Sequence, residues 1–269
     1  MIKQPSSIDD AVRDPVQVSN WSARGDFVIV CEHASNWLPS ALGTLGLARG
    51  ELHRHIAWDP GALPVSRKLA ALLDAPLVVS QVSRLAIDCN RPLDAPDLVP
   101  AVSETTVIPG NEGLSEKARD ERIALSHRPF HDVLSALIDE RLENGRRTAI
   151  VTIHSFTPVY KGVARPWHVG VIHDEDMRLA APMLAGLRRL DGVVVGDNEP
   201  YSPDDRVYYT LERHARSRGL PCAMVEIRND DIADEAAHSR WASRLAAILA
   251  EAAESLDWPL APGVAGENS

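Results

Sequence analysis

The sequence predicts an α/β fold in which helices flank a mostly parallel sheet. Runs of apolar and β-branched residues alternate along the chain with stretches whose apolar residues recur at helical spacing. Parallel neighbours need long crossover connections, and helices of the predicted length supply them. Charged and metal-capable residues also follow directly after several of the apolar runs. That placement is typical of the functional edge of an open α/β sheet.

In the first half of the chain, the apolar run FVIVC at 27–31 predicts a buried strand, and the leucines of 61–73 share one face of an amphipathic helix. Two further strands are predicted at 76–81 and 84–88. A long helical region follows at 115–144. We expect Pro129 to break this region, because proline lacks an N–H, and Gly145 to end it.

The second half repeats the alternation of strands and helices. Strands are predicted at 148–153, 167–172, 192–196 and 222–227. Helices are predicted at 175–190, 207–217 and 234–256. Because each strand is followed by a connection long enough to cross over, the whole series can join one sheet.

The composition is that of one well-packed globular domain. Of the 269 residues, 45% are hydrophobic and 25% are charged, so the chain can bury a core without metal or disulfide staples. No internal stretch has the low complexity of a linker. We therefore expect one domain over residues 20–258, with terminal extensions at 1–19 and 259–269. A metal, if present, should serve chemistry rather than folding.

The net charge and the cysteines indicate which binding partners and which cellular compartment to expect for this protein. The net charge of −10 disfavours nucleic acid and anionic membranes, which repel an acidic protein, and favours a small-molecule substrate. No stretch approaches the roughly 18 apolar residues of a membrane span, and the first twenty residues lack the apolar core of an export signal. Cys31, Cys89 and Cys222 each lie in an apolar run, as reduced cysteines do, which predicts a cytoplasmic protein.

Two histidines are candidate metal ligands. His33 follows FVIVCE and His154 follows TAIVTI, so each imidazole is expected on the rigid end of a strand. Catalytic zinc commonly takes two histidines and a carboxylate and leaves its fourth position for water. Asp59 in AWDPGA is the favoured carboxylate, although an aspartate before proline also suits a helix cap. Glu32 is the alternative ligand, disfavoured because strand alternation turns it away from His33.

Glu226 is the candidate general base. It ends the apolar run CAMVEI, and apolar neighbours that desolvate a carboxyl raise its pKa toward neutrality. A base of that kind can take a proton from a zinc-activated water and return it to a leaving amine. The alternative is a structural salt bridge, for example to Arg228.

Two Asn-Arg pairs are candidates for binding a substrate carboxylate. Asn90 and Arg91 follow the run LAID, and Arg228 and Asn229 follow CAMVEI. The planar guanidinium forms paired hydrogen bonds to a carboxylate. Two such pairs at one edge of an acidic protein predict a substrate with one or two carboxylates. The chain contains no nucleophile elbow, no P-loop and no dinucleotide fingerprint.

Six segments together carry a family resemblance. They are CEHASN at 31–36, AWDPGA at 57–62, SRLAIDCNRP at 83–92, TIHSFTP at 152–158, NEPYS at 198–202 and VEIRND at 225–230. In this order, over about residues 25–250, the chain resembles the N-formylglutamate amidohydrolase family.

The resemblance implies a phosphorylase/hydrolase-like α/β fold related to zinc carboxypeptidases and zinc amidases. It also implies hydrolysis of N-formyl-L-glutamate to formate and glutamate, a reaction of histidine breakdown. His33, Asp59 and His154 would then hold the zinc, with Glu226 as the acid/base. Asn90 and Arg91 look like the Asn-Arg pair with which carboxypeptidases hold a terminal carboxylate.

Three functions remain open on the sequence. The leading hypothesis is a zinc amidohydrolase of an N-acyl amino acid. The second is a zinc amidase or carboxypeptidase-like hydrolase of a peptide or cell-wall fragment, which the absence of an export signal disfavours. The third is a noncatalytic binding protein on the same fold, which would not need a general base.

Overall fold

A seven-stranded mixed sheet forms the centre of the molecule. The computed structural model describes residues 14–258. The strand order is β1 (Val16–Ser19), β3 (Leu77–Ser80), β2 (Phe27–Cys31), β6 (Ala149–Phe156), β11 (Cys222–Arg228), β9 (Val169–Ile172) and β10 (Val195–Asp197). The neighbours β3, β2, β6 and β11 run parallel, whereas β1 is antiparallel to β3 and β9 is antiparallel to β11. The α/β fold with a mostly parallel sheet is therefore confirmed.

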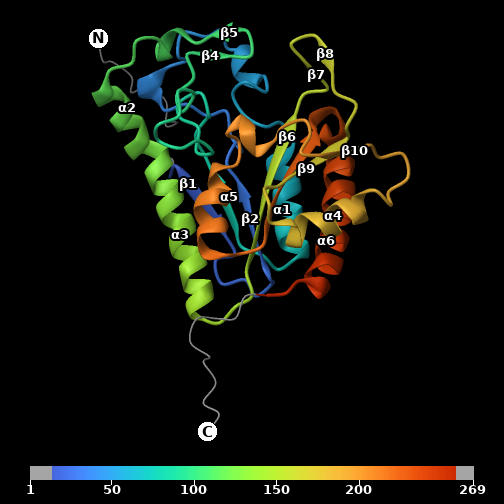
Figure 1. The fold of residues 1–269 in the computed structure, drawn as a ribbon. Coiled ribbons are helices and arrows are strands. Elements are labelled where there is room, and N and C mark those ends of the chain that lie inside the picture. The colour runs from blue at the N-terminus through green and yellow to red at the C-terminus, as the bar shows by residue number, and fades with distance from the viewer. Residues whose placement is uncertain (1–13, 259–269) are drawn as a thin grey trace, which may run out of the picture.

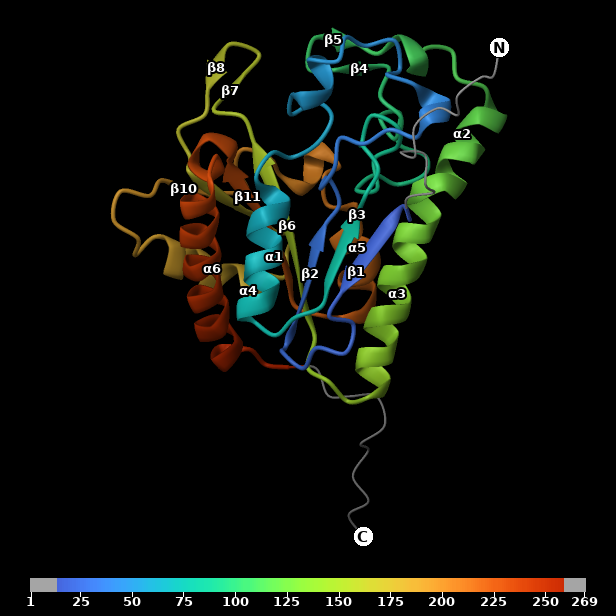
Figure 2. The ribbon, with the colours of Figure 1, turned by 180° about the vertical axis from the view of Figure 1, so that it is seen from behind.

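Helices cover both faces of this sheet (Figures 1 and 2). One face carries α1 (Ala62–Leu72), α4 (Met177–Leu187) and α6 (Glu235–Ser255). The other face carries α3 (Arg128–Glu143) and α5 (Tyr209–His214). This three-layer arrangement buries the central strands on both faces, which explains why they are continuous apolar runs in the sequence.

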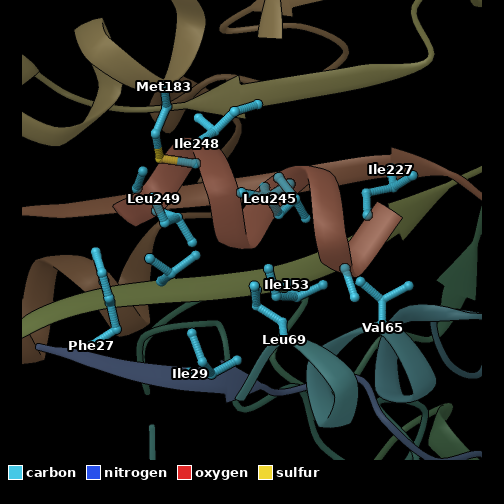
Figure 3. Close-up of a cluster of buried hydrophobic side chains, with 14 of the residues drawn as sticks. Phe27, Ile29, Val65, Leu69, Ile153, Met183, Ile227, Leu245, Ile248 and Leu249 are labelled. Carbon is cyan, nitrogen blue, oxygen red and sulfur yellow. The ribbon is translucent and has the colours of Figure 1, made fainter. Parts of the chain in front are cut away.

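The core shows how strand alternation divides the side chains between the two layers. In β2, Phe27 and Ile29 pack with α1 and α6, while Val28 and Val30 pack toward α3. Figure 3 shows the larger layer, in which Ile29 and Ile153 from the sheet lie against Leu69 of α1. Each fully buried aliphatic side chain of this kind contributes roughly 1.5–3 kcal/mol through removal from water. These contacts hold the strand ends in place.

The segment 84–88 corrects one prediction, because it forms turns instead of a strand. The Ser83 hydroxyl accepts a hydrogen bond from the Leu85 amide at 3.2 Å, and the Ser83 carbonyl accepts one from Ala86 at 2.9 Å. Such local serine bonds compete with a sheet ladder. Leu85 and Ile87 remain buried. The apolar pattern therefore reported burial correctly but not the conformation.

Pro129 does not break the long helical region, contrary to expectation. α2 (Glu116–Arg122) continues through a π-helical turn (Ile123–His127) into α3, and Pro129 lies in the first turn of α3. A wider π turn shifts the preceding carbonyls, which accommodates a ring that lacks an N–H. Gly145 does follow the helix end, with a positive φ of 67° that glycine adopts readily.

The N-terminal boundary also differs from the prediction. Val16–Ser19 is the edge strand β1, so the sheet begins before residue 20. VQVS is too short to show a clear alternation, and only pairing with β3 makes it a strand. The expected extensions at 1–13 and 259–269 lie outside the described residues. The remaining strands and helices are confirmed, with ends that shift by a few residues.

Two small hairpins stand above the carboxyl ends of the parallel strands (Figure 1). One consists of β4 (Val102–Ser103) and β5 (Thr106–Val107), and the other of β7 (Val159–Tyr160) and β8 (Val163–Ala164). All three cysteines are free and buried. Within the described range, no helix combines the length and apolarity needed to cross a membrane.

Candidate active site

Three buried donor atoms meet at the carboxyl edge of the sheet. His33 follows β2, His154 lies near the end of the neighbouring β6, and Asp59 lies in the loop before α1. The two Nδ1 atoms are 3.2 Å apart, and the Asp59 Oδ2 atom is 3.3 Å from that of His33 and 2.9 Å from that of His154. Among the described residues this group could hold a metal ion.

The far nitrogen of each imidazole faces a carboxylate. His33 Nε2 lies 2.7 Å from Asp88 Oδ1, in a hydrogen bond, and His154 Nε2 lies 3.1 Å from Glu32 Oε2, in an ion pair that lacks hydrogen-bond alignment. A carboxylate behind an imidazole holds the proton on that nitrogen. For His33 this leaves the Nδ1 lone pair facing the site, and both Nδ1 atoms point toward the Asp59 carboxylate and toward each other.

Three electron-rich atoms this close repel one another unless a cation lies among them. Zinc bonds of 2.0–2.1 Å in a tetrahedral arrangement imply donor separations of about 3.3–3.4 Å, near the 2.9–3.3 Å measured here. Protons are the competing cations. Burial by itself lowers the pKa of His33, but the charges of Asp88 and Asp59 outweigh it and raise that pKa. The residues thus fit a tetrahedral divalent ion.

Asp59 is not a helix cap in this structure. Gly61 precedes α1, and no side chain accepts a hydrogen bond from the first turn of the helix. Instead Asp59 Oδ2 faces the histidines and the Ser155 amide, while its Oδ1 lies 3.0 Å from the Arg84 guanidinium. Burial opposes the charge of this carboxyl, but Arg84 and the histidines hold its pKa well below the usual range.

Glu32, the alternative ligand, takes the opposite side of His154. Its carboxylate contacts Nε2 and not the converging Nδ1, and it is not among the residues that line the cavity. The alternation expected from the sequence does not apply, because β2 ends at Cys31 and both Glu32 and His33 lie in the turn after it. Glu32 therefore lies behind the imidazole instead of facing a common ion with it.

A cavity of about 230 Å³ opens onto the three donor atoms. Its lining is strongly polar. The charged and hydrogen-bonding side chains along it include His33, His55, Asp59, Arg84, Asp88, Asn90, Arg91, Asp97, Glu104, His154, Tyr160, Tyr201 and Glu226. Such a space suits a small charged ligand in which few atoms are apolar.

Glu226 has the properties of a general base. It lies on β11 directly beside His154 in the parallel register, and it lines the cavity. Its Oε2 is buried without a hydrogen-bond partner among the described residues. Burial raises its pKa to about 7. The alternative salt bridge to Arg228 is not formed, because that arginine pairs with Asp230 and Asp231.

Asn90 and Arg91 both line the cavity, but their side chains have different kinds of partner. The Asn90 carboxamide accepts a hydrogen bond from the Thr210 amide at 2.9 Å and donates one to the Val207 carbonyl. Arg91 lines the cavity and pairs with Asp97 at 2.8 Å. Because the Asp97 side chain is 47% exposed, a substrate carboxylate can replace it at modest cost.

The second Asn-Arg pair does not reach the cavity. Neither Arg228 nor Asn229 lines it, although Arg228 follows Glu226 by only two residues. The Arg228 guanidinium instead contacts Asp230 and Asp231 and donates to the Trp167 carbonyl at 3.4 Å. The expectation that these residues face the substrate is thus not met here, because neighbouring aspartates bind the arginine.

Arg84, Asp88 and Tyr201 belong to the cavity but had no role in the sequence prediction. Asp88 ends the run LAID, so its position after an apolar run was a usable signal. Arg84 is the first residue of the strand wrongly predicted at 84–88, and that assignment gave it no role in the site. Tyr201 lies after β10 in a segment without periodic pattern, and its one sequence signal was its place in NEPYS at 198–202, a segment of the family resemblance.

The chain is similar to a known protein family and to solved structures. The family model for N-formylglutamate amidohydrolase matches residues 25–233. The gene product Atu2144 from Agrobacterium tumefaciens is 46% identical with a TM-score of 0.88, over 90% of this chain and 96% of that one. An N-formylglutamate amidohydrolase from Ralstonia eutropha JMP134 is 16% identical with a TM-score of 0.60, over 90% and 98%. No curated protein gave a significant match.

Proposed function

Because the chain belongs to the N-formylglutamate amidohydrolase family, we propose that it is a zinc-dependent amidohydrolase that converts N-formyl-L-glutamate to formate and glutamate. Family membership makes it a hydrolase of amide bonds. The metal and the acyl amino acid are the proposed parts. The observation that supports them most directly is the convergence of two Nδ1 lone pairs and one carboxylate oxygen in a buried place.

The metal ion and the side chains of the protein have separate parts in the proposed reaction. Bound by His33, Asp59 and His154, zinc would lower the pKa of a water molecule to about 7 and polarise the amide carbonyl. Glu226 takes the proton of the attacking water and later delivers it to the leaving amine nitrogen, so that water is consumed and an acid and an amine are released. A carboxyl with a pKa of about 7 suits both transfers.

Arg91 is the proposed partner of one substrate carboxylate. Its guanidinium lines the cavity and can exchange the half-exposed Asp97 for a ligand. Asn90 is assigned a different part from Arg91. Its amide is bound to backbone groups at Val207 and Thr210, so it positions the turn that carries Arg91. Arg228 and Asn229 have no part in the proposed site.

The size and chemistry of the cavity favour this function over the two alternatives. A space of about 230 Å³ suits an amino-acid derivative better than a glycan or a long peptide. A binding protein without activity would have no use for a buried, unpartnered Glu226 beside the metal ligands. The free, buried cysteines suit a reducing compartment, so we place the reaction in the cytoplasm, within histidine catabolism.

Metal analysis and a product assay together test the proposal. The chain, purified without a histidine tag, should contain one zinc per molecule and release formate from N-formyl-L-glutamate. His154→Ala should lose both. Stoichiometric zinc in His154→Ala would refute the ligand set, and a metal-loaded wild type that releases no formate would refute the substrate.

A further inference from the structure

Arg165 and Tyr201 form a hydrogen-bonded pair in which Tyr201 lines the cavity. Arg165 directly follows β8, and Tyr201 follows β10. Arg165 Nη1 donates a hydrogen bond to the Tyr201 hydroxyl at 3.1 Å. The guanidinium carbon also lies 4.4 Å from the centroid of the Tyr160 ring and 4.8 Å from that of Tyr201. Tyr160 and Tyr201 both line the cavity.

The charge of Arg165 lacks an acidic partner. The side chain is buried, with 9% exposed, and no carboxylate of residues 14–258 lies within ion-pair distance of it. The two arginines that line the cavity differ, since Arg84 pairs with Asp59 and Arg91 with Asp97. Stacking on tyrosine rings offsets part of the desolvation cost of a cation. The part of the desolvation cost that stacking does not offset favours the binding of an anionic ligand near this cation.

The Tyr201 hydroxyl has a proton to donate. Its oxygen accepts from Arg165, so its own hydrogen must point elsewhere, and it makes no other hydrogen bond within the described part of the chain. Burial, reinforced by the charge of Glu226, raises the pKa of Tyr201 to about 12. The phenol therefore remains a donor at neutral pH, polarised by the cation behind it.

We propose that the Tyr201 hydroxyl, with Arg165 behind it, is the second anion-binding point of the cavity and holds the substrate carboxylate that Arg91 does not hold. The inference rests on the proposed function and adds to it the residue that binds the second carboxylate of the proposed diacid substrate. Tyr201 touches the substrate, and Arg165 is a positioning residue that acts through it. This pair takes the role that the sequence assigned to Arg228 and Asn229.

A purely structural role would have a different signature. The same hydrogen bond connects the β7–β8 hairpin to the segment after β10, so removing it can lower the melting temperature. A hydrogen bond with a purely structural role does not distinguish a carboxylate from a carboxamide in the ligand. Selectivity between acid and amide therefore separates anion recognition from support of the hairpin.

The experiment measures binding in a Glu226→Gln background, where turnover does not interfere. Titration calorimetry compares N-formyl-L-glutamate with its two neutral monoamides, N-formyl-L-glutamine and N-formyl-L-isoglutamine. Tyr201→Phe should weaken binding of the diacid by about 10- to 100-fold, the size expected for a lost hydrogen bond to a charged group. It should also abolish the preference over one monoamide, while Arg91→Met, which removes the positive charge, abolishes the preference over the other.

Arg165→Met should reproduce the Tyr201→Phe result, and the double variant should be no weaker than either single one, because both remove one contact. The matched control is Arg213→Met with Tyr209→Phe. Arg213 also donates to a tyrosine hydroxyl, at 2.8 Å, but this exposed pair lies outside the cavity. The control variants should bind within about twofold of the parent.

Two results would overturn the inference. In the first, Tyr201→Phe retains the preference for the diacid over both monoamides. In the second, N-formyl-L-glutamate does not bind to the parent at all. Failure of the proposed function has a separate sign, which is a wild type that binds the diacid but releases no formate.

Discussion

At the scale of single residues, the inward orientation of the imidazole lone pairs decides the chemistry of the site. Asp88 and Glu32 face the outer nitrogens of His33 and His154, and each Nδ1 is directed into the site, where Arg84 Nη1 lies 3.3 Å from that of His33. Such carboxylate partners fix the tautomer and strengthen the ligand. The proposed metal site therefore consists of five side chains, of which only three would touch the ion.

Replacement of the Asp88 carboxylate should weaken metal binding without removing a ligand. Asp88→Asn keeps the shape but gives His33 a weaker partner, so zinc affinity should fall by about 10- to 100-fold. Competition with a chromogenic chelator measures this affinity. Asp97→Asn is the control, because Asp97 lines the same cavity but pairs with Arg91 and not with a histidine. Equal zinc affinity in the two variants would contradict the orienting role.

Glu226 separates proton transfer from metal binding. Glu226→Gln retains the shape of the side chain but cannot accept a proton, so kcat should fall by about 10²- to 10⁴-fold while KM changes little. Zinc content and the melting temperature should stay near those of the wild type. A variant that loses its zinc would make Glu226 a ligand, and one with near-normal turnover would leave the base unidentified.

At the scale of elements, two helices support the turn that carries Asp88 and Arg91. His131 on α3 donates from Nε2 to the Cys89 carbonyl at 2.9 Å, and its Nδ1 lies 2.8 Å from Nε2 of His214 on α5. Because the carbonyl requires a donor, His131 Nδ1 must accept the proton of His214. Both histidines are therefore neutral in the folded chain. Protonation of His131 or His214 would break this series of hydrogen bonds.

This histidine pair should make stability sensitive to acid. Burial lowers the pKa of His131 to about 2 and that of His214 to about 3. Since the folded pKa lies below the unfolded one of about 6.5, the contribution of each group is complete above pH 6.5. It is lost as the pH falls toward 3, by up to about 1.4 kcal/mol per pH unit and histidine.

Urea unfolding at a series of pH values tests the sign of this dependence. His214→Gln should lower stability at pH 7.5 but flatten the decline between pH 6.5 and pH 4. The exposed His53→Gln is the control and should retain the wild-type slope. A wild-type stability that stays constant over this interval, or rises toward acid, would show that the histidine pair does not titrate on unfolding.

At the scale of the whole molecule, the metal would join parts of the chain that the sheet brings together. The three donors come from the end of β2, from β6 and from the loop before α1. Their mutual repulsion destabilises this edge unless a cation is bound. The large core on both faces of the sheet does not depend on the site. Metal loss should thus weaken the fold without abolishing it.

Chelation should lower the melting temperature while the chain stays folded. An ion present at a hundred times its dissociation constant stabilises the folded state by about 2.7 kcal/mol, which corresponds to roughly 5–10 °C for a domain of this size. Scanning fluorimetry before and after dialysis against a chelator, followed by return of zinc, measures the shift. Circular dichroism of the metal-free protein at 25 °C should retain the helical signal, and its loss would contradict an independent core.

Most strands and helices, and the positions of His33, His154 and Glu226 at or near strand ends, could be predicted from the sequence. This was possible because buried strands need continuous apolar runs, and a residue directly after such a run must lie at the sheet edge. The same reasoning misread 84–88, where burial without a ladder gives the same apolar pattern. Local pattern reports whether a side chain is buried but not which hydrogen bonds its backbone makes.

The tertiary structure alone decided which polar side chains face the cavity. The sequence favoured Asp59 as a ligand but left a cap of α1 open, and only the positions of His33 and His154 show its carboxylate turned to them. Arg228 is held by its neighbours Asp230 and Asp231, whereas Tyr201 lines the cavity and is bonded to Arg165 from a segment distant in sequence. Which partner a long polar side chain binds depends on small differences in distance and desolvation. Those differences exist only after the chain has folded.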